Sequence, residues 1–173
     1  NFGQVRFDIE VRQTGNITPD GADEAEFMIS VNPGEDLRPL AKIASGGELS
    51  RIMLGIKSVL ANKDDTDTLI FDEIDTGISG RTAQKVSEKM ALIARSHQVI
   101  CITHLPQIAA MADIHFLIEK NIKDGFTTTS INRLSDQEII TELARMLGGS
   151  QITDLVMDNA AQMKEFADNL KKQ

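Results

Sequence analysis

The sequence contains no tryptophan, no tyrosine and a single cysteine, Cys101, among its 173 residues. Seven phenylalanines are its only aromatic residues, so the core must be built mainly from isoleucine, leucine, valine, methionine and alanine. A lone cysteine excludes an internal disulfide, which suits a reducing compartment. No apolar run approaches the length of a membrane span, and the first residues lack the layout of a signal peptide. We therefore expect a cytoplasmic protein that makes no contact with a membrane.

Positive charge is also scarce. The 18 Lys and Arg residues face 26 Asp and Glu residues, which gives a formal net charge of −8. Broad binding to DNA, RNA or an anionic membrane requires clustered basic side chains, so this balance excludes it and leaves only a local basic patch open. The chain also lacks the GxxxxGK[ST] loop that cradles nucleotide phosphates. It therefore cannot hold a nucleotide by such a loop on its own.

What the sequence does contain is an alternation of strand and helix patterns. Residues 1–32 have the pattern of an antiparallel pair of half-buried strands, because apolar and polar residues alternate around a turn-rich stretch. After residue 45, helical periodicity alternates with short apolar runs, which predicts an α/β fold with a mostly parallel sheet and flanking helices. The expected strands cover residues 68–71, 98–103, 114–120 and 126–134, and the expected helices cover 45–62, 81–95, 105–111, 135–149 and a last segment with Leu155, Met163, Phe166 and Leu170.

The strand over residues 68–71 ends in two carboxylates, Asp72 and Glu73. Its continuous apolar run, TLIF, is typical of a strand buried on both faces, and open α/β sheets bind ligands at the carboxyl ends of their strands. An aspartate there can hold Mg²⁺ beside nucleotide phosphates, and the next glutamate can accept a proton from an attacking water. The alternative is that Asp72 and Glu73 only begin a solvated loop, and this motif alone does not decide between the two.

The stretch ASGGELSR places two glycines at the start of the first predicted helix. Ser45 and Glu48 have the spacing of a capping box, for which the glycines would merely ease the turn into the helix. A capping box needs no glycine, however, and glycine in a helix costs about 1 kcal/mol relative to alanine. Gly46 and Gly47 therefore indicate a close approach to the backbone, and an anion at the helix N-terminus fits that position.

A histidine, His104, follows the second apolar strand and lies at the same sheet edge as Asp72 if the two strands are neighbours. A histidine there can hydrogen-bond a phosphate oxygen or a water. The alternative is a loop histidine before Pro106, which is a suitable first residue of a helix. His97 and His115 lack metal-ligand spacing, so we assign them no role. No grouping of serine, cysteine or histidine suggests a covalent nucleophile.

In their order and spacing, these motifs resemble the carboxyl-terminal half of an ATP-binding-cassette ATPase head. Residues 45–48 match the signature motif, residues 69–73 the Walker B strand, Asp75 the D-loop and His104 the switch histidine. The stretches ASGGELSRIMLGIK, FDEIDTGISGRTAQKV and ITHLPQIAAMAD are most similar to the SMC-like DNA-repair ATPases of bacteria, over roughly residues 40–150. One departure is Ala44, where leucine is usual, but it lies outside the glycines that would face phosphate.

The resemblance implies a head that is split in sequence. An amino-terminal segment of the same protein would carry the Walker A loop, a long coiled coil would follow, and this chain would return to complete the head. Three parts are then expected here: an antiparallel β element over residues 1–40, an ATPase lobe over 41–150 and a carboxyl-terminal helix over 151–173. Two heads would sandwich two ATP molecules in an ATP-dependent homodimer, and the whole protein would act on DNA double-strand breaks and associate with the nucleoid on DNA damage.

The resemblance also implies a role for each matched residue. Asp72 would hold Mg²⁺ through water, Glu73 would polarise the attacking water, and His104 would support the γ-phosphate and that water. Asp75 would organise the contact between heads. The signature motif would reach the ATP held by the opposite head through Ser45, Gly46, Gly47 and Glu48. Because phosphoryl transfer depends on positioning, and the Walker A loop is absent, we expect this chain alone neither to bind ATP tightly nor to hydrolyse it.

Three other functions stay open from the sequence. A non-catalytic dimerisation module would share the fold, and the retained Glu73 counts against it because a degenerate head can lose that residue. The nucleotide-binding subunit of a membrane transporter would carry its Walker A loop on the same continuous domain, so the absence of that loop here counts against this alternative. The head of a chromosome-organising SMC ATPase is the nearest alternative, and only the stretches DTGISG and THLPQIA separate the two.

Overall fold

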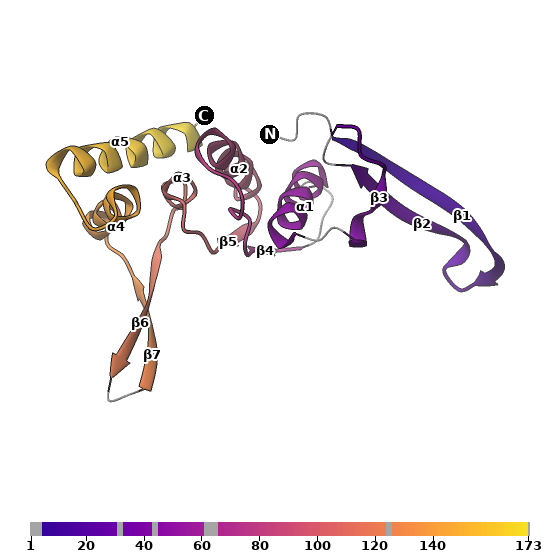
Figure 1. The fold of residues 1–173 in the computed structure, drawn as a ribbon, viewed down its shortest axis with the longest axis horizontal. Helices are drawn as coiled ribbons and strands as arrows, with labels where there is room; N and C mark the ends of the chain where they lie inside the picture. Colours follow the sequence, from indigo (N-terminus) through magenta and orange to yellow (C-terminus); the bar gives the residue numbers. More distant parts are fainter. Residues whose placement is uncertain (1–4, 31–32, 43–44, 61–65, 124–125, 173) are drawn as a thin grey trace.

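The computed structural model describes residues 5–30, 33–42, 45–60, 66–123 and 126–172. The described chain is elongated, with a long β-hairpin at one end, an α/β unit in the middle and a pair of helices at the other end (Figure 1). The strands are β1 (Arg6–Thr18), β2 (Gly21–Ser30), β3 (Arg38–Pro39), β4 (Thr68–Phe71), β5 (Gln98–Cys101), β6 (Phe116–Lys123) and β7 (Phe126–Arg133). The helices are η1 (Leu40–Lys42), α1 (Gly46–Leu60), α2 (Gly80–Ile93), α3 (Pro106–Ala109), α4 (Asp136–Gly148) and α5 (Asp154–Lys171).

The first hairpin confirms the antiparallel pair predicted near the amino terminus. In β1 and β2, Ile9 lies opposite Phe27, and the rings of Phe7 and Phe27 stack with their centroids 5.6 Å apart. The short strand β3 adds to the free edge of β2, in a stretch for which the sequence analysis predicted no strand. Residues 1–4 and 31–32, which also belong to the predicted pair and its flanks, lie outside the described residues.

The middle unit is a parallel pair of strands covered by helices. Strands β4 and β5 pair in register from Thr68 opposite Gln98 to Phe71 opposite Cys101. One face of this pair packs against the apolar sides of α1, α2 and α3, which supply the largest core cluster. That cluster comprises Leu54, Leu69, Phe71, Ile74, Ala83, Val86, Met90, Ile93 and Ile108. The helices predicted here are present and each contributes buried side chains to this cluster, although Leu49, Met53, Val59 and Leu60 of α1 are exposed.

The other face of the parallel pair is exposed, which corrects the prediction that β4 is buried on both faces. Leu69 and Phe71 are buried, whereas Ile70 is 68% exposed, and on the neighbouring strand and its end Ile100 is 45% and Ile102 is 52% exposed. A strand that is apolar on both faces normally contacts a layer on each side. In the described residues only the helical layer is present.

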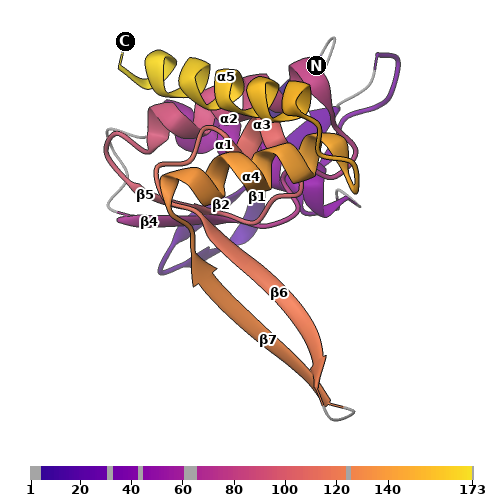
Figure 2. The same ribbon diagram turned by 90° about the vertical axis from the view of Figure 1, so that its left-hand side faces the viewer.

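The prediction of a mostly parallel sheet is not confirmed. Strand β6 was expected to follow β5 in that sheet, but it pairs antiparallel with β7, with Ile118 opposite Ile131. The two strands form a separate hairpin that projects away from the helices (Figure 2). In the part of the chain that the structure describes, parallel pairing is confined to β4 and β5, so the fold is α/β with three small sheets.

Helices α4 and α5 lie side by side and close the molecule at its carboxyl end (Figure 2). The predicted helix after residue 135 is present and begins with a capping box, since Ser135 and Glu138 bond reciprocally at the start of α4. Small residues of α5 let the two helices approach, with Ala160 and Ala167 buried in a second core cluster that also includes Leu143 of α4.

The last helix buries less of its apolar face than the sequence predicted. Met163 and Leu170 pack against the second cluster, but Leu155 is 78% and Phe166 is 59% exposed. The helix is also tied to the preceding lobe, because the Lys164 ammonium donates to the carbonyl of Ala112 at 3.0 Å. No helix among the described residues has both the length and the apolar composition needed to cross a membrane.

Candidate functional site

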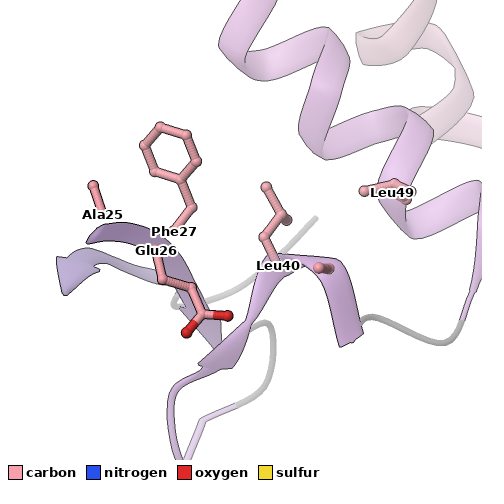
Figure 3. Close-up of a pocket in the computed structure, with 6 residues that line it drawn as sticks. Ala25, Glu26, Phe27, Leu40 and Leu49 are labelled. Atoms are coloured by element: carbon pink, nitrogen blue, oxygen red, sulfur yellow. The ribbon is translucent and has the colours of Figure 1, made fainter. Parts of the chain in front are cut away.

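Two open pockets were compared as candidate sites, and the larger one carries no convergent polar groups. It has a volume of about 340 Å³ and lies between β2, η1 and α1. Its walls are apolar apart from one carboxylate, Glu26, with Phe27, Leu40 and Leu49 facing the gap (Figure 3). A binding site normally adds a few placed polar groups to its apolar walls. This pocket lacks them, so we do not assign it chemistry.

The second pocket lies at the carboxyl ends of β4 and β5 and gathers the predicted site residues. Its volume is about 260 Å³, and it is lined by Asp72, Glu73, Asp75, Thr76, Ile102, Thr103 and His104. The parallel register brings the two strand ends together, and the N–H of Ile102 donates to the carbonyl of Phe71 at 3.0 Å. The expected neighbourhood of His104 and the two carboxylates after β4 is therefore confirmed.

Asp75 is the best-connected carboxylate of this pocket. It is only 3% exposed, and its Oδ2 accepts hydrogen bonds from the Thr103 hydroxyl at 2.6 Å and from the backbone N–H of His104 at 2.8 Å. Burial by itself would raise the pKa of Asp75, but the bonds from Thr103 and His104 outweigh burial and lower that pKa. The Asp75 carboxylate is thus a buried charge, and its hydrogen bonds connect the loop after β4 to the loop after β5.

The His104 ring is oriented by the same carboxylate. Its Nδ1 lies 3.0 Å from Asp75 Oδ2, while the side chain as a whole is 73% exposed. A neutral imidazole that donates from Nδ1 to a carboxylate presents Nε2 as an acceptor, and a protonated one presents a second donor. The histidine is therefore fixed at one nitrogen and open to the pocket at the rest of its ring.

Asp72 and Glu73 lie on the exposed turn that follows β4. The Asp72 carboxylate accepts the N–H of Glu73 at 2.9 Å, and the Glu73 carbonyl accepts the N–H of Thr76 at 3.0 Å. Glu73 has a φ of 56°, the only positive φ of a non-glycine residue in the described part of the chain. A left-handed glutamate costs about 1–2 kcal/mol, and such outliers gather at functional sites.

The start of α1 packs directly on this turn, which explains the two glycines. A methyl group added at Gly46 would overlap the Glu73 carboxylate, and one added at Gly47 would lie 2.8 Å from the Glu73 carbonyl oxygen and 3.0 Å from Thr76 Cβ. The N–H of Glu48 points to the Ser45 hydroxyl at 3.5 Å, a long version of the predicted cap. The close approach predicted from the glycines is real, and within this chain the approaching group is the Glu73 turn.

Three site residues were missed by the sequence analysis. Thr103 holds Asp75, while Ser50 and Arg51 of α1 bond the backbone of the turn after β4. Thr103 directly precedes His104 just after a strand, and this position was the only feature of the sequence that could have indicated a role for it. Ser50 and Arg51 follow the glycines by one helical turn, which places them near the same surface as the helix start.

Asp72 is the residue best suited to a divalent cation. Its exposed carboxylate stands beside the pocket, and Mg²⁺ is usually held by one or two carboxylates together with substrate phosphates and water. Within the described residues, no group of three or more His, Cys, Asp or Glu side chains forms a ready-made metal cage. Cys101 is not a candidate nucleophile, because burial raises the pKa of its thiol to about 12.

Comparisons with known proteins identify relatives over most of the chain. It is 50% identical over 159 residues to DNA repair protein RecN of Bacillus subtilis (strain 168), which covers 92% of this chain and 28% of that protein. It is 46% identical over 161 residues to DNA repair protein RecN of Vibrio cholerae serotype O1, covering 92% of this chain and 29% of that protein. The chain thus spans less than a third of the length of these relatives. No family model matches it.

Among solved structures, the chain resembles the Smc head domain with a coiled coil and joint from Pyrococcus yayanosii. The TM-score is 0.54 with 21% sequence identity, over 79% of this chain and 25% of that one. At this level of identity the likeness describes the fold and nothing further.

Proposed function

Because this chain belongs to the RecN family of DNA repair proteins, we propose that it forms the carboxyl-terminal half of an SMC-like ATPase head. An amino-terminal segment of the same protein would supply the Walker A loop, which this chain lacks. The observation that carries the proposal is the pocket at the ends of β4 and β5, where Asp72, Glu73 and His104 meet. The reaction would be hydrolysis of ATP, by attack of water on the γ-phosphate.

Each residue of the pocket has a role that fits its position. Glu73 accepts a proton from the attacking water as the new P–O bond forms and the bond to ADP breaks. His104, held at Nδ1 by Asp75, supports the γ-phosphate and the water from its open side. Asp72 would hold Mg²⁺. When bound, that ion would offset the negative charge of the phosphates.

The exposed face of the parallel pair supports the proposed partner segment. Ile70, Ile100 and Ile102 form an apolar face that the helices of this chain do not cover. Large apolar patches that are exposed to solvent commonly mark sites where another segment or protein binds. We assign this face to the Walker A-bearing segment, since that segment must also reach the carboxyl ends of β4 and β5 to bring its nucleotide to Asp72.

Two heads would share each nucleotide. In this proposal Asp72 and Glu73 serve the ATP held beside their own chain, while Ser45 and the N–H groups of Gly46 and Gly47 contact the γ-phosphate on the opposite head. Free N–H groups and the helix dipole favour an anion at the start of α1. The Glu73 carboxylate lies against Gly46 here, so a phosphate can occupy that place only after this exposed side chain turns away.

A complementation assay tests this division of labour. One head is made with Glu73→Gln and the other with Ser45→Arg. Each variant alone should be inactive, whereas their mixture should recover about a quarter of the wild-type rate, because half of the pairs are mixed and each mixed pair keeps one intact site of two. A mixture as silent as its parts would show that Ser45 and Glu73 serve the same nucleotide.

In the whole protein, ATP-driven engagement of two heads would act in the repair of DNA double-strand breaks, in the cytoplasm and on the nucleoid after damage. In this proposal the main DNA contacts lie on other segments, which the acidity of this chain supports. A non-catalytic dimerisation module would instead tolerate Glu73→Gln without loss of function. The head of a chromosome-organising SMC ATPase would give the same results in these assays and would differ in its effect on break repair.

A further inference from the structure

The turn that carries the carboxylates is held to α1 by bonds that the proposed mechanism does not use. The Ser50 hydroxyl donates to the carbonyl of Asp72 at 2.9 Å. Arg51 Nη1 donates to the carbonyl of Ile74 at 3.0 Å and to that of Thr76 at 2.8 Å. Three backbone carbonyls of one five-residue stretch are therefore bound by two adjacent side chains of the helix that begins with the glycines.

The geometry of Arg51 suits this role. Its Nη1 lies 3.0 Å from the place that a methyl group would take on Gly47, which is closer than an ordinary van der Waals contact, so the guanidinium occupies the space beside the glycine. Burial lowers the pKa of Arg51, although the nearby charges of Glu48 and Asp75 oppose that change, and the group stays charged at neutral pH. A partly desolvated guanidinium binds carbonyls more strongly than one in water, because fewer waters compete for its protons.

We infer that Ser50 and Arg51 are positioning residues that make the start of α1 and the Glu73 turn one mechanical unit. The inference rests on the proposed function and deepens it. If a phosphate of the opposite head binds at Ser45 and Gly46, any resulting shift of α1 passes through these bonds to Glu73 and Asp75. Glu73 would then reach its working position only when the second head is engaged, so hydrolysis is coupled to head engagement.

The test is a double-mutant cycle in the reconstituted head, made by co-expressing this chain with the Walker A-bearing segment. Single-turnover hydrolysis at high enzyme concentration, which resolves the slow residual rate left by Glu73→Gln, is measured for the wild type, Arg51→Ala, Glu73→Gln and the double variant. We expect Arg51→Ala to lower the hydrolysis rate about 10–100-fold with ATP affinity within about twofold of wild type, since misplacement of a catalytic group costs rate rather than binding. In the Glu73→Gln background the same change should cause no further loss.

Matched controls and a second pair of variants guard against simple misfolding. Arg95→Ala removes an exposed arginine that follows α2, and Ser58→Ala removes a hydroxyl of α1 that bonds within its own helix, at Gly55. Both should keep the wild-type rate. Arg51→Lys keeps a donor and should recover part of the rate, and Ser50→Ala, which removes a single bond, should give a smaller loss.

Two results would overturn the inference. The first is that Arg51→Ala and Ser50→Ala match their controls. The second is that Arg51→Ala slows hydrolysis equally with and without Glu73, which would mean that it acts on general stability. If Glu73→Gln itself leaves hydrolysis unchanged, the proposed function fails first, and this inference fails with it.

Discussion

Asp75 is a buried carboxylate whose charge is balanced by donors from the neighbouring strand end. We predicted it at a contact between heads, and that role stays a prediction. What the structure adds is an internal role, since its Oδ2 accepts from Thr103 and from His104 and so fixes the histidine ring. His104, the proposed support of the γ-phosphate, thus depends on a residue that need not touch the nucleotide.

Replacement of Thr103 by valine should expose that dependence. Valine keeps the shape but removes a hydrogen bond to a charged, buried group, so the free energy of unfolding should fall by about 1.5–3 kcal/mol at pH 7. The folded-state pKa of Asp75 is lowered, so its stabilisation is present above the unfolded pKa of about 3.9 and is lost as the pH falls through the folded value. The difference between valine and threonine should therefore shrink below about pH 4.

Urea denaturation followed by circular dichroism at pH 7 and pH 3 measures this difference. Thr103→Ser keeps the hydroxyl and serves as the control. A loss of stability that is the same at both pH values would show that Thr103 acts by packing and not through the charge of Asp75.

At the scale of elements, α1 packs on the turn after β4 through two glycines, and the two glycines face different parts of that turn. At Gly46 an added methyl group meets only the end of the flexible Glu73 side chain, whereas at Gly47 it meets the Glu73 carbonyl and Thr76. The first collision can be relieved by rotating a side chain. The second requires the backbone of the turn to move.

Alanine substitutions at the two glycines should therefore separate activity from stability. Gly46→Ala should leave the free energy of unfolding unchanged or raise it by up to about 1 kcal/mol, because alanine favours the helix, and should still reduce hydrolysis, because the methyl group takes the place proposed for the phosphate. Gly47→Ala should lower the free energy of unfolding by about 1–3 kcal/mol. Equal effects of the two substitutions on unfolding in urea would contradict the described contact.

Local patterns predicted the elements better than their partners. The capping box of Ser135 and Glu138, the helical spacing of α1 and α2, and the shared edge of His104 and Asp72 were all predictable, because each depends on neighbours in sequence or on one strand pairing. The sequence Lys123-Asp124-Gly125 between two strand patterns is typical of a hairpin turn, but nothing in these patterns indicated that β6 and β7 form a sheet separate from the parallel pair. Likewise, the glycines predicted a close approach to the backbone, but they did not indicate that the approaching group is Glu73 of the same chain.

Burial was predicted least well, for a physical reason. The apolar run of β4 predicted contact on two faces, but Ile70 is exposed. The sequence pattern of a strand reflects every layer that it contacts in the protein where it functions. A prediction from that pattern fails when the chain supplies only one of the layers.

At the scale of the whole molecule, all three sheets share this incomplete burial. Exposed apolar side chains stand on β1, on the parallel pair and on the projecting hairpin, where Ile118 and Ile131 face each other on one exposed side. A two-stranded hairpin with an uncovered apolar face is only marginally stable by itself. The simplest account is that another segment completes each of these layers, as the proposed split head requires.

The most direct test of this account is the steady-state ATPase activity of the chain alone, of the amino-terminal segment alone and of the two together, each with and without Glu73→Gln. We predict hydrolysis only in the mixture, and its loss with Glu73→Gln. Robust turnover by this chain alone, or turnover by the mixture that does not depend on Glu73, would contradict the account. Silence in a mixture whose two pieces are shown to associate would contradict it as well, and would identify the chain as a non-catalytic interaction module.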